Sequence, residues 1–207
     1  MKKNKAKLAL FALMICLFCA VTIFAAYASG NNKSGSLLNN TEIASYAYAG
    51  NYYDPCAKNY TLLGEFKTEF SPHLKSRNSN IKLAAKALDG TIILPGEELS
   101  FNEAVGPTTK ENGYQLSRIF IKGKDKKGYG GGVCQVSSTL YNAALKAGMD
   151  ITERHAHSKD VYYVQEGMDA AVSYGGIDLK FANPHDTPVK ISTSVSDSEI
   201  YITIAAI

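Results

Sequence analysis

Beyond its first few residues, the chain lacks the excess of positive charge that a nucleic-acid-binding protein needs. Its 207 residues carry 22 lysines and arginines against 19 acids, and four of those lysines precede Leu8. The other basic residues are matched by the acids, so no basic stripe is left to neutralise phosphates. Binding to nucleic acid is therefore not expected.

Cysteine is also scarce. Of the four cysteines, Cys16 and Cys19 lie in the apolar N-terminal segment, which leaves Cys56 and Cys134 for the rest of the chain. That part of the chain therefore has no Cys-x-x-Cys pair of the kind that binds zinc. In an oxidising compartment Cys56 and Cys134 can pair with each other, whereas in an anaerobic setting both would stay free.

The first 28 residues predict a membrane-targeting segment. A short basic stretch is followed by residues 8–28, which carry no charge and are long enough to span a bilayer. Because basic residues stay on the cytoplasmic side, the rest of the chain is expected outside the cell. We expect a single-pass anchor in the cell membrane. Cleavage after Ala28, which would release a secreted protein, is the alternative.

The chain contains neither an internal repeat nor the strand–helix alternation of a parallel sheet. Residues 29–61 are rich in Asn, Ser, Gly, Ala and Tyr and are expected to be a linker. Residues 62–207 are long enough for one domain with its own core. We expect an α+β fold, a single and mostly antiparallel β domain with two main helices.

Apolar periodicity predicts where the helices and strands lie. One helix is expected over residues 80–89, capped by Ser79 or Asn80, and the other directly after Gly132, ending at a capping Gly148. Residues 122–127 are expected to form a charged loop, and the last two strands an antiparallel hairpin. Strands are expected over residues 65–70, 91–94, 99–102, 118–121, 161–164, 171–174, 178–181, 189–195 and 199–205.

The stretch from Gly130 to Gly148 combines three glycines, Cys134 and the start of a helix. In the first helical turn, unpaired N–H groups and the helix dipole favour a thiolate. The glycines allow a sharp turn and the close approach of a substrate. This pattern is typical of an acyl-transfer site with a cysteine nucleophile. Alternatively, Cys134 is a small buried apolar side chain.

A cysteine nucleophile needs a base, usually a histidine that a third group orients. His155 and His157 follow the helix, and in an extended segment both rings would point to one face, where one can reach Cys134. Asp169 and Asp178 are the candidate orienting carboxylates, although both also fit turns. Two alternatives stay open: solvent-facing histidines, or a zinc site formed with Cys134.

These segments resemble the VanW family, which occurs among accessory proteins of vancomycin-resistance clusters and in Gram-positive envelope proteins. The resemblance covers about residues 66–204 and is most specific in the run Cys-Gln-Val-Ser-Ser-Thr-Leu-Tyr-Asn over residues 134–142. Further matching segments are residues 77–81, 94–97, 100–102, 105–107, 113–114, 130–132, 153–154, 157–158, 167–170 and 178–181.

The resemblance implies an L,D-transpeptidase that cross-links the stem peptides of peptidoglycan. Cys134 would attack the amide between the third and fourth residues of a donor stem and form a thioester. The side-chain amine of a neighbouring stem would then resolve the thioester into a 3–3 cross-link. His157 would be the general base, oriented by Asp169 or, as a second choice, by Asp178. Better-known L,D-transpeptidases carry a His-Gly-Cys segment that is missing here, so their fold is not implied.

Backbone N–H groups between Gly132 and Gln135 would stabilise the oxyanion. Arg77 or Arg154 would hold stem carboxylates by bidentate pairing, or else pair with a structural acid. No metal and no cofactor are expected. The expected substrate-binding residues are Arg77, Gly131, Gly132, Gln135, Ser138, Arg154 and Asp178.

Two other functions stay open. With water as the acceptor, the same thioester chemistry would make the protein an L,D-carboxypeptidase or a cysteine peptidase. If Cys134 is merely packed, the domain would be a non-catalytic module that binds peptidoglycan. In every case the expected partners are peptidoglycan stem peptides and, through the N-terminal segment, the membrane. The sequence leaves the identity of any protein partner open.

Overall fold

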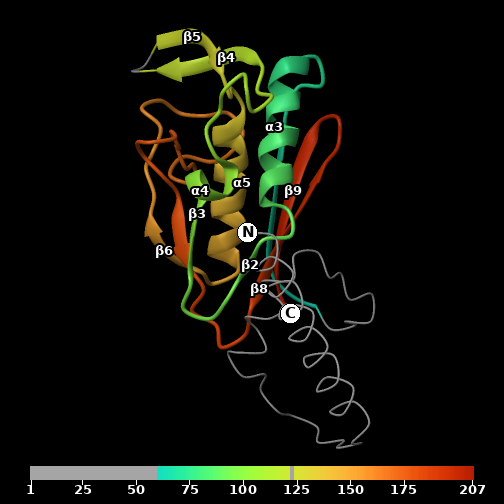
Figure 1. Ribbon diagram of the computed structural model, residues 1–207, viewed down its shortest axis with the longest axis vertical. Helices are drawn as coiled ribbons and strands as arrows, with labels where there is room; N and C mark the ends of the chain where they lie inside the picture. Colours follow the sequence, from blue (N-terminus) through green and yellow to red (C-terminus); the bar gives the residue numbers. More distant parts are fainter. Residues whose placement is uncertain (1–59, 122–123) are drawn as a thin grey trace, which may run out of the picture. The chain divides into compact units, whose positions relative to one another are not determined.

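The structure is a computed structural model that describes residues 60–121 and 124–207. The anchor predicted over residues 1–28, nearly all of the linker predicted over 29–61, and Cys56 lie outside these residues. Within the described ranges, no helix is both long enough and apolar enough to cross a bilayer. The elements in chain order (Figure 1) are β1 (Thr61–Glu69), α3 (Lys75–Leu88), β2 (Ile92–Ile93), β3 (Glu98–Ser100), α4 (Phe101–Val105), β4 (Leu116–Ile121), β5 (Lys124–Tyr129), α5 (Val133–Lys146), β6 (Asp150–Glu153), β7 (Lys180–Ala182), β8 (Val189–Val195) and β9 (Glu199–Ala206).

The strands of the described residues pair antiparallel throughout. A large sheet has the order β1-β9-β8-β2, a small sheet the order β3-β7-β6, and β4 and β5 form a separate hairpin. β8 and β9 pair along their length as the predicted C-terminal hairpin. The expected α+β fold with mostly antiparallel strands is therefore confirmed.

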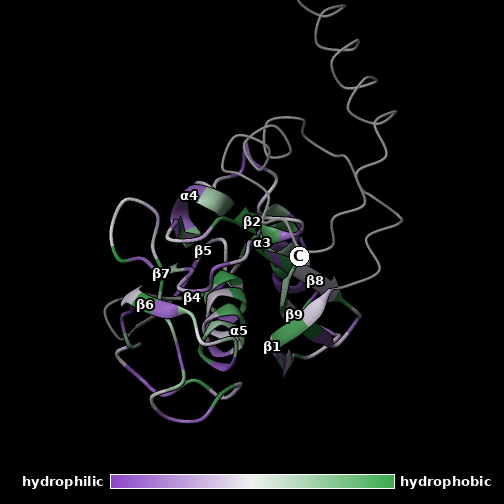
Figure 2. Ribbon diagram, turned by 90° about the horizontal axis from the view of Figure 1, so that it is seen from below, coloured by the Kyte–Doolittle hydropathy of each residue, from purple (hydrophilic) through white to green (hydrophobic). Residues whose placement is uncertain are grey.

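Helix α5 lies at the centre of the domain, between the two sheets (Figure 1). It packs against β1 and β9 on one side and contacts β6 on the other, while α3 packs beside it on β8. Figure 2 shows hydrophobic residues along both α5 and β1. Val136, Leu140 and Ala144 of α5 are fully buried in one core with Ile202 and Ile204 of β9. Burial of these side chains is the main source of the domain's stability.

β1 approaches α5 so closely that one of its residues must be glycine. A Cβ atom added to Gly64 would lie 2.3 Å from the Ala147 nitrogen and 2.5 Å from the Ala143 carbonyl oxygen. Backbone atoms cannot move aside as a side chain would. The register of β1 against β9 also shifts between Leu62 and Gly64, as at a β-bulge, which bends a strand locally.

Two predicted boundaries were wrong. Helix α3 begins at Lys75 and not at Asn80, and its N-cap residue, Leu74, makes no side-chain cap hydrogen bond. Asn80 is instead a fully buried helix residue whose amide binds the carbonyls of Gln115 and Gly131. The charged loop predicted over residues 122–127 was also wrong in part, because Lys124–Tyr129 forms β5 and pairs with β4.

The connection between β6 and β7, residues 154–179, is named here the β6–β7 loop. Strands were expected within it over residues 161–164 and 171–174, and the structure shows irregular backbone and turns there. Asp150–Glu153, for which no strand was expected, forms β6. Apolar and aromatic residues in the loop resemble strand composition, but they pack without joining a ladder.

Candidate active site

Cys134 is the second residue of α5. Its position follows from Gly132, which caps the helix with a φ of 107°, a conformation that side-chain-bearing residues rarely adopt. A Cβ atom on Gly132 would lie 2.9 Å from Ile81 Cγ1, and one on Gly131 would lie 2.4 Å from the Arg118 carbonyl oxygen. The glycines therefore allow the expected sharp turn. The close approach they permit is that of the chain's own α3 and β4.

Cys134 is a partly open position in the first turn of a mostly buried helix. It is half-buried, and among the described residues it is the free cysteine. Its thiol donates a long hydrogen bond of 3.5 Å to the Val172 carbonyl in the β6–β7 loop. A sulfur sealed in an apolar interior, the alternative considered from the sequence, is not what the structure shows. The α5 residues that are buried are Val133, Gln135, Val136, Ser137, Ser138, Thr139, Leu140, Asn142, Ala143 and Ala144.

His157 and Asp169 form a tight pair beside this cysteine. His157 Nδ1 lies 2.6 Å from Asp169 Oδ2, and the His157 backbone N–H donates to the same oxygen at 2.6 Å. The other oxygen, Asp169 Oδ1, accepts a hydrogen bond of 2.6 Å from Arg154 Nη2. Because Nδ1 is occupied by the carboxylate, Nε2 is the ring nitrogen left for the thiol.

The surroundings of the pair shift the pKa values of His157 and Asp169 in opposite directions. Burial lowers the pKa of His157, but hydrogen bonding and charge from Cys134 and Asp169 outweigh it and raise the pKa above the ordinary value near 6.5. For Asp169, burial raises the pKa, and the hydrogen bonds and charge of His157, with the charge of Arg154, bring it below the ordinary 3.8. The thiol, the imidazole and the carboxylate thus interact as one group.

Three polar residues of α5 fix Asp169 in place. Ser137 Oγ donates to the Ala170 carbonyl at 2.6 Å, and Ser138 Oγ accepts from the Ala170 N–H at 2.9 Å. Asn142 Nδ2 donates to the Met168 carbonyl at 2.7 Å. Residues 168–170 are therefore attached to the helix that carries Cys134. Ser138, expected to line a pocket, is fully buried and holds the loop instead.

Arg154 secures the same segment from the outside. Its Nε donates to the Asp169 carbonyl at 2.6 Å and its Nη2 to the Gly167 carbonyl at 3.1 Å, in addition to the bond with the carboxylate. The guanidinium also lies over the Tyr141 ring, 5.6 Å from its centroid. Of the two roles considered from the sequence, the structure shows pairing with an acid of the chain, namely Asp169, the candidate orienting carboxylate.

Gln135 and Arg77 occupy the opposite side of the first turn. Gln135 has no exposed surface, and its Nε2 donates to Thr68 Oγ1 and to the Glu69 carbonyl, both at 2.9 Å. Its Oε1 accepts from Arg77 Nη2 at 2.7 Å. The Gln135 side chain therefore ties α5 to β1 and holds Arg77. The Nη1 atom of Arg77 is buried and has no hydrogen-bond partner among the described residues.

Two predicted residues lie elsewhere. His155 Nε2 lies 3.0 Å from Glu153 Oε1, so its ring does not share a face with that of His157. Asp178 caps α4, since its carboxylate accepts from Ser100 Oγ at 2.5 Å and from the Asn102 N–H at 2.9 Å. Residues 154–157 belong to no strand, and the two histidines bind different carboxylates, Glu153 and Asp169. Within the described residues, no cluster of His, Cys, Asp and Glu is suited to a metal ion.

Sequence reasoning missed Tyr163, Ser137 and Asn142. Burial raises the pKa of Tyr163 well above its usual range, with a further contribution from the neighbouring Cys134, which places the phenol at the site in its protonated form. Tyr163 was assigned to a strand that does not form. Ser137 and Asn142 lie in the nine-residue run around Cys134, and their shared polarity on a buried helix was the available signal.

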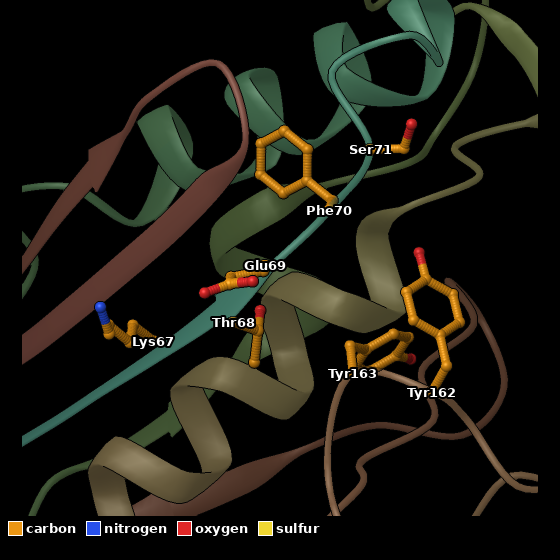
Figure 3. A pocket seen from close by; sticks show the side chains of 7 residues that line it. All are labelled: Lys67, Thr68, Glu69, Phe70, Ser71, Tyr162 and Tyr163. Atoms are coloured by element: carbon orange, nitrogen blue, oxygen red, sulfur yellow. The ribbon is translucent and has the colours of Figure 1, made fainter.

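A groove adjoins the site on the β1 side, and we name it the edge groove. It has a volume of about 540 Å³. Figure 3 shows residues of β1 on one side of it and the two tyrosines of the β6–β7 loop on the other, near the first turn of α5. Tyr162 is 73% exposed and its ring meets that of Tyr163 edge to face at 5.4 Å. The residues lining the groove are Lys67, Thr68, Glu69, Phe70, Ser71, Tyr162 and Tyr163.

Comparison with known proteins gives a consistent result. Residues 76–205 match the family model described as VanW like protein. The chain is 44% identical over 142 residues to the uncharacterized protein YoaR of Bacillus subtilis, covering 69% of this chain and 47% of that protein. It is 35% identical over 126 residues to the vancomycin B-type resistance protein VanW of Enterococcus faecalis, covering 58% of this chain and 46% of that protein. The chain thus spans about half the length of these curated relatives. No solved structure matches it.

Proposed function

The chain belongs to the VanW family, a family associated with vancomycin resistance, and we propose that its domain is a cysteine acyltransferase of the cell envelope. Its substrates would be peptidoglycan stem peptides, and its reaction L,D-transpeptidation to 3–3 cross-links. The observation that carries this proposal is the grouping of Cys134, His157 and Asp169. A thiol at a helix start, an imidazole and an orienting carboxylate are the parts of a nucleophilic acyl-transfer site.

In the first half-reaction, Cys134 would give its proton to His157 Nε2 and attack the carbonyl carbon of the donor amide. The C–N bond breaks, and the leaving amine of the terminal D-amino acid takes the proton from His157. The product is a thioester on Cys134. Asp169 supports this step because it holds the ring through Nδ1 and stabilises the imidazolium.

In the second half-reaction, the side-chain amine of a neighbouring stem would attack the thioester carbonyl. His157 accepts the amine proton, the C–S bond breaks, and the proton returns to the sulfur. One amide is lost and one is formed, so the exchange needs no cofactor and no external energy source. If water takes the place of the amine, the same site would act as a carboxypeptidase, which is the second candidate.

The first turn of α5 offers an oxyanion donor. The Val133 N–H donates to the Gly130 carbonyl and the Gln135 N–H to the Gly132 carbonyl, both at 3.0 Å. The N–H of Cys134 lies between them, in the turn where helix N–H groups lack an intrahelical acceptor. Such a donor is worth about 3–4 kcal/mol to a transition state that carries an oxyanion. Of the donors expected between Gly132 and Gln135, the N–H groups of Gly132 and Cys134 remain as candidates.

Arg77 is the candidate for binding the donor's terminal carboxylate. Its side chain lies against Gly132, and a Cβ atom there would be 3.0 Å from Arg77 Cγ. Its second terminal nitrogen has no partner, as described above, and guanidinium groups pair strongly with carboxylates. We further propose that residues 1–28 anchor the protein in the membrane and that residues 29–61 let the domain reach the wall outside the cell.

The test compares the full chain, purified in detergent, with its Cys134→Ala variant on disaccharide-tetrapeptides. The wild-type protein should release the terminal D-amino acid, carry a thioester visible by intact mass, and produce cross-linked dimers. The variant should do none of these while its circular dichroism stays unchanged. Equal dimer formation by the variant would reject the proposal. Tripeptides without dimers would favour the carboxypeptidase, and binding without products the non-catalytic module.

A further inference from the structure

β1 is an edge strand whose outer side faces the edge groove. Within residues 60–121 and 124–207, β9 is the one strand that pairs with it, on the inner side. The Phe70 N–H donates to the Ser198 carbonyl at 2.7 Å. In an antiparallel ladder, successive residues direct their main-chain groups to opposite edges, so those of Glu69 and Lys67 point outward. The outward direction is supported by the Glu69 carbonyl, which accepts a hydrogen bond of 2.9 Å from the Gln135 amide of α5 and not one from β9.

The edge groove has the form that an added peptide strand requires. One wall carries the outward main-chain groups of Lys67 and the N–H of Glu69, whose carbonyl is bound by Gln135, and the other carries the rings of Tyr162 and Tyr163 (Figure 3). A volume of about 540 Å³ is within the range of small-ligand sites. A strand added here would gain main-chain hydrogen bonds from the protein, as in other cases of peptide recognition at a sheet edge.

The charges around the groove favour an occupant with an amine. Lys67 Nζ is paired with Glu199 at 2.8 Å, which leaves Glu69 as a lining carboxylate without an ion pair among the described residues. The Tyr162 ring already faces a cation, because Arg77 Cζ lies 6.0 Å from its centroid. Donor and acceptor stems carry the same groups, but the acceptor is the stem that must present its side-chain amine to the thioester, and Glu69 is the lining carboxylate that attracts this amine.

Two residues that line the groove also interact with the first turn of α5, although Cys134 itself is not part of the lining. Thr68 lines it and accepts a hydrogen bond of 2.9 Å from Gln135, the residue after Cys134. Tyr163 lines it as well, and the charge of Cys134 acts on its phenol. A peptide held along β1 would therefore bring its side chains to the first turn of α5, where the thioester forms.

We propose that the edge groove binds the acceptor stem peptide as an additional strand on β1 and directs its side-chain amine to the thioester on Cys134. This inference rests on the proposed function. The bound amine forms the new C–N bond, the C–S bond breaks, and the amine proton leaves through His157. Occupancy of the groove then decides whether the thioester is transferred to an amine or hydrolysed by water.

The first experiment removes the outward N–H of β1. Proline at position 67 lacks that donor, and an edge strand tolerates proline where the N–H faces away from the ladder. The full chains of Lys67→Pro, Lys67→Ala and the wild type are given disaccharide-tetrapeptide as donor and acceptor. We expect Lys67→Pro to lower the ratio of cross-linked dimer to hydrolysed tripeptide about three- to tenfold relative to Lys67→Ala, the effect of one lost hydrogen bond. The amount of thioester per Cys134 should stay the same.

A second variant, Glu69→Gln, changes charge at an exposed position and does not depend on the backbone. It should lower the same ratio roughly three- to fivefold at low salt and less at high salt, as for an exposed charge pair. Unchanged ratios in both variants, with normal thioester, would overturn the inference and leave the proposed function intact. If Lys67→Pro forms no thioester, Glu69→Gln alone decides. Absence of thioester in the wild type would reject the proposed function itself.

Discussion

The two sides of α5 are held by different kinds of interaction. Toward the large sheet, apolar residues of the helix share a fully buried core with Ile200, Ile202 and Ile204 of β9. Toward the β6–β7 loop, Ser137, Ser138 and Asn142 make hydrogen bonds to main-chain groups. Apolar burial is strong but non-directional, whereas hydrogen bonds are modest and depend on geometry. The large-sheet side therefore stabilises the helix, and the loop side positions Asp169.

The difference explains why the chain uses buried hydroxyl and amide groups next to a candidate nucleophile. Apolar residues at positions 137, 138 and 142 would bury as much surface, but they would not fix the distance between Asp169 and Cys134. The same comparison leads to three predictions, given from the largest expected effect to the smallest.

The largest effect on folding should come from the large-sheet side. Ile202→Ala removes a fully buried side chain and should lower the free energy of unfolding by about 2–5 kcal/mol. Urea denaturation measures the loss. The rate of thioester formation per folded molecule should not change. The control is Ile92→Ala, an isoleucine of the same sheet that is 42% exposed and should change stability by at most about 0.5 kcal/mol. A slower rate in the folded Ile202→Ala protein would contradict the division of roles.

A substitution on the loop side should cause a smaller loss of stability but a larger decrease in the rate of thioester formation. Ser138→Ala leaves the buried Ala170 N–H without its acceptor and should cost about 1–3 kcal/mol. Because Ala170 adjoins Asp169, thioester formation should slow as well. Thr139→Val is the matched control, since it deletes a buried hydroxyl that binds β1 through Thr68. Equal rates in the two variants would show that Ser138 has no positioning role.

The smallest effect should appear in the pH dependence of stability. Because the folded-state pKa of His157 is raised, its pairing with Asp169 stabilises the fold fully below about pH 6.5, and this contribution is lost as the pH rises through the folded-state pKa. The pKa of Asp169 is lowered in the folded state, so the contribution of Asp169 to the free energy of unfolding is lost only as the pH falls below about 3.8. The stability difference between the wild type and Asp169→Asn should thus be largest near pH 5–6 and shrink toward pH 9. A difference that stays constant across this range would argue against the ion pair.

Local patterns in the sequence predicted the large-sheet side well. The period of α5, the alternation in β1 and the C-terminal hairpin of β8 and β9 were all readable, because each depends on neighbours within a few residues. The start of α3 was not, because the side chain of Asn80 bonds residues 35 and 51 positions away along the chain. A residue type that often caps helices here ties three segments together.

The loop side shows the limit of such reading more clearly. Cys134, His157 and Asp169 were chosen by residue type and by resemblance, and the structure brings them together. The strands expected within the β6–β7 loop do not form, because its order comes from side-chain hydrogen bonds to α5 across 26 to 33 positions. Gln135 and Ser138 were expected to line a pocket because they are polar and lie next to the candidate nucleophile. Polarity in a sequence does not say whether the partner will be a ligand or the chain's own backbone.

The partly open position of Cys134 has a practical consequence. It is the cysteine that the described residues contain, it is half-buried, and its thiol lies against the Val172 carbonyl. In a protein whose Cys16, Cys19 and Cys56 are replaced by serine, an electrophilic dye would therefore label this one sulfur. The fluorescence of such a label would respond to a peptide entering the groove, so ligand affinity becomes measurable in a protein whose chemistry has been switched off.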